Sequence, residues 1–269
     1  MKKLFCLLLS TLVVLSFPAC AREKTEDSLP PALPVTETTV PPVTEPATFP
    51  MEEPTTVPTE PPVVFHSGLR EDGSFDAGTW FIGDSLTCLL ITDYLIPNGL
   101  LGDARYTAKY GSQLTAFFGS TTMEPNASLK CVYSPEFEGM EIDEAAVSLG
   151  EQATAIYLMW GTNFTPDATA MSYVEIVDYL LENCPNATVH LQTVPYGYPK
   201  MIAFETINER IRGAYDHYRQ SGEDRVFLID TFTAIGRNND KGGIHLNNTG
   251  NENWYQAILA HAEASGLVQ

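Results

Sequence analysis

The stretch Thr79-Trp80-Phe81-Ile82-Gly83-Asp84-Ser85-Leu86 decides the fold class. It begins with a short apolar run, residues 79–83, which is typical of a buried strand. From residue 86 to residue 95 the apolar positions recur with helical spacing. Gly83 and Asp84 lie between the two segments, and both residue types favour turns. The stretch therefore predicts a strand, a tight turn and a helix.

The same alternation continues along the chain. Further strands are expected at residues 104–109, 155–160, 188–194 and 225–230. Further helices are expected at residues 142–149, 168–182, 203–219 and 249–264. Residues 121–140 show no clear period, so we interpret them as an insertion. Strands that alternate with helices at this spacing predict an α/β domain, in which helices cover both faces of a parallel sheet.

The N-terminus carries the features of an export signal. Lys2 and Lys3 precede an apolar stretch, residues 4–17, which is too short to span a bilayer permanently but has the length of a signal h-region. We therefore divide the chain into a signal peptide at residues 1–20, a tether at 21–64 and a folded domain at 65–269. The mature protein is expected to leave the cytoplasm.

The end of the signal is open to two interpretations. Phe17-Pro18-Ala19-Cys20 resembles a bacterial lipobox, in which Cys20 would be acylated and become the new N-terminus. Ala19-Cys20-Ala21 also fits an A-x-A site, with cleavage after Ala21 and secretion of a free protein. We favour lipidation because the segment that follows suits a surface anchor. The expected location is the outer surface of the bacterial cytoplasmic membrane, or else the medium.

Residues 21–64 have the composition of a disordered spacer. They contain eleven prolines and nine threonines, and Phe49 is their one aromatic residue. Such a segment cannot bury enough surface to offset its chain entropy, and its prolines favour extended polyproline II. We therefore predict a tether that carries the folded domain away from its anchor.

The net charge limits the partners. The chain has 34 acidic and 15 basic residues, which gives a formal charge of −19. Phosphate backbones and anionic lipid surfaces repel such a chain, so we expect no nucleic-acid partner and no membrane contact beyond the lipid anchor.

Neither cysteine nor histidine spacing indicates a metal site. After the signal region the cysteines are Cys88, Cys131 and Cys184, which we interpret as small core residues or as one disulfide with a third thiol left over. The histidines His66, His190, His217 and His261 lack metal-ligand spacing and are expected to be structural or exposed. The sequence predicts no metal and no organic cofactor.

Chemistry is expected where strands end, because ligands of open α/β sheets bind at the carboxyl ends of the strands. Four places there stand out: Gly83-Asp84-Ser85-Leu86, Gly111, Gly161-Thr162-Asn163 and Gly243-Ile244-His245-Leu246. A serine at the start of a helix, with a histidine as its general base, suits acyl transfer. The N–H groups of Ser85 and Gly111, with the carboxamide of Asn163, are candidates for an oxyanion hole. Asp84 is expected to hold the turn.

These four blocks, in this order, resemble those of the GDSL/SGNH hydrolase family across residues 65–269. The resemblance implies a flavodoxin-like three-layer α/β/α sandwich whose five parallel strands lie in the order 2-1-3-4-5, and hydrolysis of ester bonds. It makes Ser85 the nucleophile, His245 the general base, and Gly111 and Asn163 oxyanion-hole residues. Gly119 lies close to the short second block and is an alternative to Gly111.

The chain departs from the family pattern in two places. The family's last block is usually Asp-x-x-His, and Gly242 occupies the aspartate position. Asp240, five residues before His245, is a candidate to orient the imidazole; the other candidate is a backbone carbonyl, which would make a Ser–His dyad. The third block often continues with aspartate, where Phe164 stands here.

The sequence therefore predicts an exported serine esterase that hydrolyses short-chain esters, acetyl above all, on a small molecule or on a cell-wall or plant polysaccharide. Two alternatives remain. An O-acyltransferase of the same fold would differ mainly in its exclusion of water, and the missing aspartate also permits a degenerate domain that only binds glycan.

Overall fold

The computed structural model describes residues 64–118, 131–163, 173–195, 203–236 and 243–267. The predicted signal peptide, Cys20 and the tether as far as residue 63 lie outside the described residues, so their assignments stay predictions.

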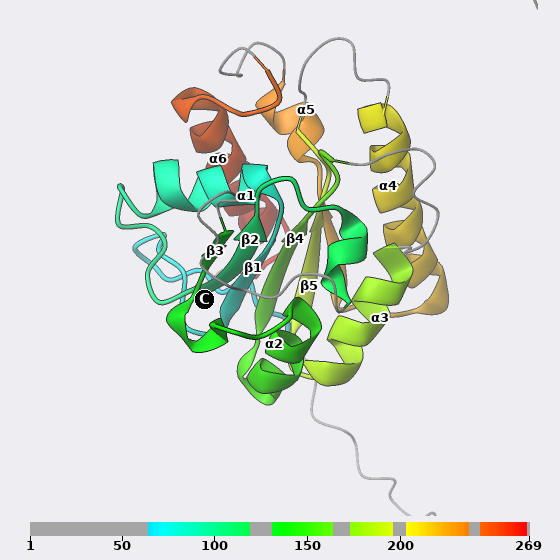
Figure 1. Cartoon of the computed structure of the whole chain (residues 1–269). Coiled ribbons are helices and arrows are strands. Elements are labelled where there is room, and N and C mark those ends of the chain that lie inside the picture. Colours follow the sequence, from blue (N-terminus) through cyan, green and yellow to red (C-terminus); the bar gives the residue numbers. More distant parts are fainter. Residues whose placement is uncertain (1–63, 119–130, 164–172, 196–202, 237–242, 268–269) are drawn as a thin grey trace, which may run out of the picture. The chain divides into compact units, whose positions relative to one another are not determined.

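A single sheet forms the centre of the described domain (Figure 1). Its strands are β1 (Thr79–Gly83), β2 (Arg105–Lys109), β3 (Cys131–Tyr133), β4 (Ala155–Met159), β5 (Thr188–Gln192) and β6 (Val226–Ile229). They lie in the order β3-β2-β1-β4-β5-β6, and the five strands other than β3 are parallel. Without β3 this is the predicted order 2-1-3-4-5, so the parallel sheet and its strand order are confirmed. Each parallel neighbour is reached by a crossover connection, as alternating strands and helices require.

The sixth strand, β3, is a correction to the sequence prediction. It pairs antiparallel with β2 at the edge of the sheet, with Thr107 opposite Tyr133 and Lys109 opposite Cys131. We expected only an insertion at residues 121–140. A strand of three residues has no measurable periodicity, and its strand conformation depends on its partner rather than on its own sequence.

The helices follow the predicted alternation. They are α1 (Ser85–Leu89), α2 (Ile142–Leu149), α3 (Tyr173–Asn183), α4 (Ala203–Ser221), α5 (Thr231–Ile235) and α6 (Asn248–Ala264). The first helix continues as a π-helical segment, η1 (Leu90–Leu95), and three short 3₁₀ turns are η2 (Leu114–Phe117), η3 (Pro135–Phe137) and η4 (Gly150–Gln152). Helix α5 was not predicted. The predicted start of α3, residues 168–172, lies outside the described residues.

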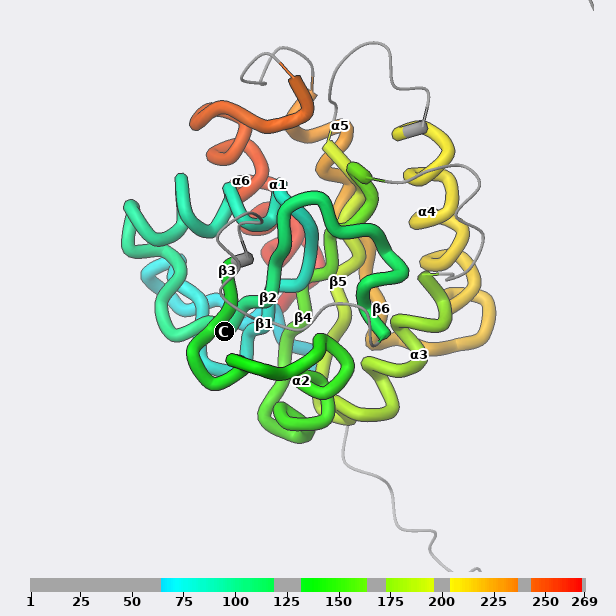
Figure 2. The backbone as a smooth tube through the Cα atoms, in the orientation of Figure 1, coloured from blue at the N-terminus to red at the C-terminus, as the bar shows by residue number. Residues whose placement is uncertain are grey.

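The helices form two layers, one on each face of the sheet. Helices α1 and α6 pack on one face, with α5 beside α6, and helices α3 and α4 pack on the other, with α2 beside α3 (Figures 1 and 2). The described domain is therefore a three-layer α/β/α sandwich, as the sequence predicts.

A row of rings lies across the sheet beneath α6. The register places Phe81, Tyr157, His190 and Phe227 on four neighbouring strands, and each ring stacks on the next with centroids 5.0, 4.6 and 5.7 Å apart. His261 of α6 packs edge-on against His190 at 5.5 Å. Aromatic pairs on neighbouring strands stabilise a sheet beyond the area that they bury.

The core contains most of the large apolar side chains. Trp80, Trp160 and Trp254 are fully buried, and so are Cys88 and Cys184. These two cysteines are therefore core residues, which agrees with the first of the two interpretations of the sequence. Among the described residues, we find no helix with the length and hydropathy that a bilayer crossing requires.

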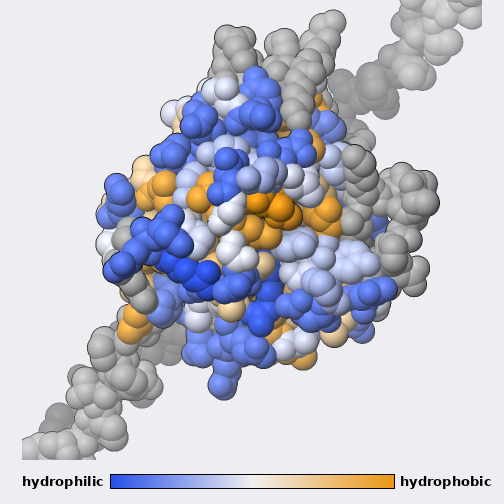
Figure 3. Space-filling model, turned by 90° about the vertical axis from the view of Figure 1, so that its left-hand side faces the viewer, coloured by the Kyte–Doolittle hydropathy of each residue, from blue (hydrophilic) through white to orange (hydrophobic). Residues whose placement is uncertain are grey.

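Some apolar surface remains on the outside. Val64, Ile96 and Val147 are 61%, 49% and 57% exposed. Figure 3 shows one face, on which hydrophobic residues gather near the middle and hydrophilic residues surround them. Val64, Ile96 and Val147 are far apart in the sequence, and exposed apolar side chains that occur singly are normal for a folded domain.

Candidate active site

The register of the sheet brings three of the four sequence blocks together at the carboxyl ends of the strands. Gly83, the last residue of β1, lies between Ala108 of β2 and Met159 of β4. All three strands are parallel, so the residues that follow them leave the sheet on the same side. Ser85, Gly111 and Asn163 each come within four residues of these strand ends.

The turn after β1 requires glycine at position 83. A side-chain carbon on Gly83 would overlap both the carbonyl oxygen of Met159 and the hydroxyl of Thr87. Only a residue without a Cβ lets helix α1 start so close to the end of β4. The glycine therefore sets the position of the serine two residues later.

Asp84 fixes this turn with four hydrogen bonds. Its Oδ1 accepts from the N–H of Leu86 at 3.0 Å and so caps α1. Its Oδ2 accepts from the N–H groups of Gly161 and Thr162 at 3.1 and 2.9 Å, and from the Thr162 hydroxyl at 2.6 Å. Complete burial raises the pKa of the Asp84 carboxyl above its usual value, and the four hydrogen bonds act in the opposite direction. Asp84 thus joins the first block to the third.

Ser85 and His245 are in contact at the carboxyl end of the sheet. Ser85 is the first residue of α1 and is 2% exposed. Its Oγ lies 3.2 Å from Nε2 of His245, which is half-buried and comes just before Asn247, the N-cap of α6. The Ser85 hydroxyl can donate to Nε2 when the imidazole carries its proton on Nδ1. This is hydrogen-bond contact between a nucleophile and a base that lie 160 residues apart in the sequence.

The His245 ring also contacts the ring of Tyr110. The two ring centroids are 5.6 Å apart and the ring planes meet at 62°. Burial above all, together with the charges of Cys88 and Asp93, raises the pKa of the Tyr110 phenol to about 12. Tyr110 is therefore un-ionised at neutral pH. Asp240 and Gly242 lie outside the described residues, so the orienting role of Asp240 stays a prediction.

A second network ties the end of β4 to the end of β2. The carboxamide nitrogen of Asn163 donates to the Ser112 carbonyl at 3.1 Å and to the Thr162 hydroxyl at 3.3 Å. The indole N–H of Trp160 lies 3.2 Å from the same carbonyl and 3.1 Å from the Ser112 hydroxyl. Asn163 is thereby held next to the second block.

Gly111 precedes Ser112 in a left-handed conformation, with φ of 71°. Such a φ favours glycine and turns the chain sharply after β2. Among the described residues the Gly111 N–H has no hydrogen-bond acceptor. Gly119, the alternative for this block, lies outside them.

The sequence assigned no role to Ser112, Thr162 or Tyr110, because each acts through a contact between distant segments.

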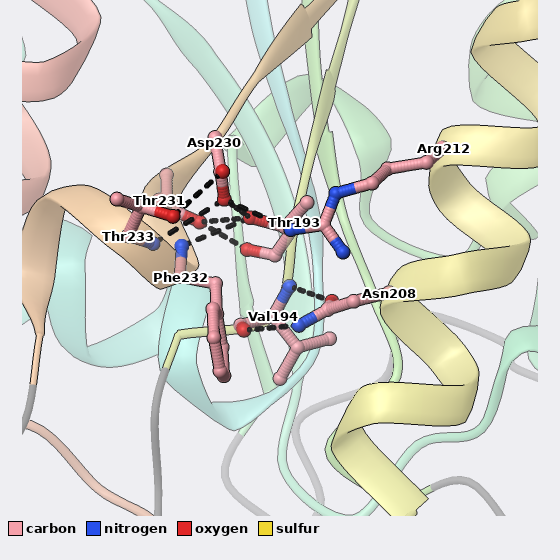
Figure 4. Close-up of polar contacts among 8 residues, drawn as sticks. All are labelled: Thr193, Val194, Asn208, Arg212, Asp230, Thr231, Phe232 and Thr233. Atoms are coloured by element: carbon pink, nitrogen blue, oxygen red, sulfur yellow. Dashed lines mark hydrogen bonds and ion pairs between the residues drawn. The ribbon is translucent and has the colours of Figure 1, made fainter.

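A polar cluster holds the carboxyl ends of β5 and β6 (Figure 4). The Thr193 hydroxyl donates to Asp230 at 3.0 Å and accepts from the N–H of Phe232 at 2.9 Å. Arg212 of α4 lies 3.3 Å from the same carboxylate, and Asp230 caps α5 through Thr233. The cluster therefore fixes the start of α5 against the carboxyl ends of β5 and β6.

The remaining titratable side chains show no arrangement of metal-ligand type among the described residues. Within the described ranges, no three His, Cys, Asp or Glu side chains are grouped as metal ligands. His190 is fully buried in the row of rings and His261 packs against it, so both histidines are structural.

The fold defined by this sheet and these helix layers is that of the SGNH hydrolases. An active-site mutant of a family two carbohydrate esterase from Clostridium thermocellum superposes with a TM-score of 0.50 and 15% identity, over 71% of this chain and 64% of that one. The present chain thus spans less than two thirds of that esterase. No family model and no curated protein sequence matches the chain.

Two other solved structures are similar at lower scores. The C-terminal catalytic domain of peptidoglycan O-acetyltransferase A from Streptococcus pneumoniae gives a TM-score of 0.41 at 14% identity, over 70% of this chain and 94% of that one. A GDSL-like lipase from Parabacteroides merdae gives 0.43 at 12% identity, over 77% of this chain and all of the other. The fold assignment therefore uses only the carbohydrate esterase with the TM-score of 0.50, and at 15% identity that likeness shows the fold alone.

Proposed function

We propose that this protein is a serine esterase in which Ser85 is the nucleophile and His245 the general base. The observation that carries the proposal is the 3.2 Å separation between Ser85 Oγ and His245 Nε2. A serine that merely capped a helix would need no histidine in contact with its hydroxyl. The resemblance of four sequence blocks to the GDSL/SGNH family supports the same roles.

The first half of the reaction acylates the enzyme. Ser85 Oγ attacks the ester carbonyl carbon while its proton passes to His245 Nε2, and the carbonyl electron pair moves onto oxygen. When the tetrahedral intermediate collapses, the bond to the alcohol oxygen breaks and that oxygen takes the proton from His245. In the second half a water molecule attacks the acyl-serine by the same route, which releases the acid and restores Ser85.

The oxyanion is proposed to be held by the N–H groups of Ser85 and Gly111 and by the Asn163 carboxamide. Both N–H groups are suited to the role, since the first amides of a helix have no intrahelical partner and the Gly111 N–H has no acceptor among the described residues. Asn163 already donates twice, so the oxyanion would replace the longer bond, the one of 3.3 Å to Thr162.

Either Asp240 or a backbone carbonyl would orient the His245 imidazole. The serine, the histidine and the oxyanion hole keep a large part of the catalytic power when the carboxylate of a triad is removed. A dyad would therefore still turn over esters, at a reduced rate.

The proposed substrate is a short acyl ester, acetyl above all, on a polysaccharide outside the cell. Support comes from the export signal and from the fold shared with a carbohydrate esterase. Lipidation of Cys20 and the tether at 21–64 would hold the enzyme at the membrane surface while it reaches a wall polymer.

Release of nitrophenol from acetyl and butyryl nitrophenyl esters tests the proposed activity. We expect Ser85→Ala and His245→Ala to lose turnover by at least about 10³-fold, since each removes a member of the nucleophile–base pair. Ser148→Ala, at an exposed serine of α2, is the matched control and should keep full activity. Equal rates in Ser85→Ala and the unaltered protein would contradict the esterase assignment. Acyl transfer to an added glycan without hydrolysis would instead identify a transferase.

A further inference from the structure

The imidazole of His245 makes two side-chain contacts with described residues. One is the hydrogen bond to Ser85, and the other is the edge-to-face contact with the Tyr110 ring, whose centroid lies 5.6 Å away. The hydrogen bond fixes the position of one ring nitrogen. It leaves the imidazole free to rotate about that nitrogen unless something holds the plane of the ring.

Tyr110 is well placed to hold that plane. It follows β2 directly and precedes Gly111, whose left-handed turn fixes where the chain leaves the sheet. Its ring is thereby placed at the end of β2, in edge-to-face contact with the ring of His245.

We propose that Tyr110 is a positioning residue that holds the His245 imidazole toward Ser85, on a chain whose sequence lacks the aspartate of the usual Asp-x-x-His block. This inference rests on the proposed esterase function. The contact acts through the aromatic ring: edge-to-face pairs have a preferred geometry, so the tyrosine ring restricts the tilt of the imidazole. The Tyr110→Phe variant below separates this effect of the ring from any effect of the hydroxyl.

The Tyr110 ring acts on the imidazole in a different way from the absent aspartate. A carboxylate would accept a hydrogen bond from Nδ1 and select the tautomer. An aromatic ring selects only an orientation. The tyrosine and a backbone carbonyl or Asp240 can therefore act on the same imidazole without competing for one atom.

The test compares three substitutions by steady-state kinetics on nitrophenyl acetate with the full mature protein. Tyr110→Leu removes the ring, and we expect kcat to fall roughly 5-fold to 10-fold, the size of one edge-to-face contact, with KM changed less than about 2-fold. Tyr110→Phe keeps the ring and should restore kcat to within about 2-fold of the unaltered protein. Tyr179→Leu is the matched control, because it removes a half-buried tyrosine with edge-to-face contacts to Phe117 and Phe118. It should leave kcat unchanged.

Two results would overturn the inference. One is unchanged kcat in Tyr110→Leu; the other is an equal loss in Tyr110→Leu and Tyr110→Phe, which would assign the effect to the hydroxyl. Tyr110→Met is made alongside, so that a second non-aromatic variant is available if Tyr110→Leu does not fold. Failure of the proposed function gives a different result. In that case the unaltered protein would hydrolyse no ester, or the Ser85→Ala variant would hydrolyse it as well as the unaltered protein does.

Discussion

The Thr162 hydroxyl donates a 2.6 Å hydrogen bond to the buried carboxylate of Asp84 and accepts one of 3.3 Å from the Asn163 carboxamide. This relay connects the turn that presents Ser85 to the residue proposed for the oxyanion hole. Asp84 therefore holds both the turn that presents Ser85 and the residue before Asn163.

Removal of the Thr162 hydroxyl should loosen both partners. We expect Thr162→Val to lower the free energy of unfolding by about 1–3 kcal/mol, because Asp84 loses a donor in a fully buried place. The rate of ester turnover should fall as well, since Asn163 loses one anchor. Urea unfolding and nitrophenyl acetate turnover measure the two effects. Thr162→Ser keeps the hydroxyl and should recover most of both; a valine variant that behaves like the unaltered protein would disprove the relay.

Asp84→Asn should be more damaging than its small change in shape suggests. The two carboxylate oxygens of Asp84 accept four hydrogen bonds, whereas a carboxamide replaces one of these oxygens with an NH2 group, which only donates. At least one N–H of Gly161, Thr162 or Leu86 would therefore be left buried without an acceptor. We expect a loss of at least about 2–3 kcal/mol in urea unfolding. The matched control is Asp103→Asn, at an ion pair whose aspartate side chain is 68% exposed, where the loss should stay below about 1 kcal/mol. Similar losses in the two variants would argue against the buried network.

Stability should fall on acidification because of His190. Burial first, and then the nearby His261, lowers the pKa of His190 from 6.5 to about 3. The folded protein therefore binds fewer protons at this site than the unfolded chain. The contribution to stability is complete above pH 6.5 and is lost as the pH falls toward 3. Between pH 7.5 and pH 4.5 we expect a loss of about 2–3 kcal/mol from this group.

The pH effect is isolated by a variant that does not titrate. The Nε2 of His190 donates to the His66 carbonyl at 3.0 Å, and a glutamine can make the same hydrogen bond. Urea unfolding of His190→Gln at the same pH values should show a flatter profile, whatever its stability at pH 7.5. Parallel profiles for the two proteins would show that His190 does not carry the acid sensitivity.

Substitution of Cys20 tests the proposed anchor. Cys20→Ala removes the thiol that would be acylated but leaves the predicted signal h-region intact. In the expected outcome, the unaltered protein stays with the membrane fraction and incorporates a labelled fatty acid, and the variant does neither. If both proteins are found in the medium with an N-terminus after Ala21, ordinary signal cleavage is correct and the lipid anchor is not.

Much of the fold could be predicted because its parallel strands are buried. Residues 80–82 and 155–159 are apolar and buried; Gly83 follows the first run directly, and Gly161 follows the second after Trp160. The short elements could not be predicted. Strand β3 has three residues, and α5 has five and begins with a threonine that is better known in strands. Its start is set instead by Asp230, which caps it after β6.

The pairing of Ser85 with His245 followed from the order of the sequence blocks, but the rest of the site did not. The contact between Tyr110 and His245 joins the end of β2 to the start of α6, and no local pattern reports such a contact. The same is true of Ser112, whose carbonyl holds Asn163. The role of Asp84 in the turn was predicted, whereas its bond to Thr162 depends on the register of β1 and β4.

The most direct test of the central claim is the site of covalent modification by a fluorophosphonate, which traps activated serines. We predict stoichiometric labelling of the protein at Ser85, located by peptide mass spectrometry, with His245→Ala labelled at least about 10²-fold more slowly because the base in hydrogen-bond contact with Ser85 is gone. Labelling at another serine, or labelling of Ser85 at the same rate without His245, would contradict the account.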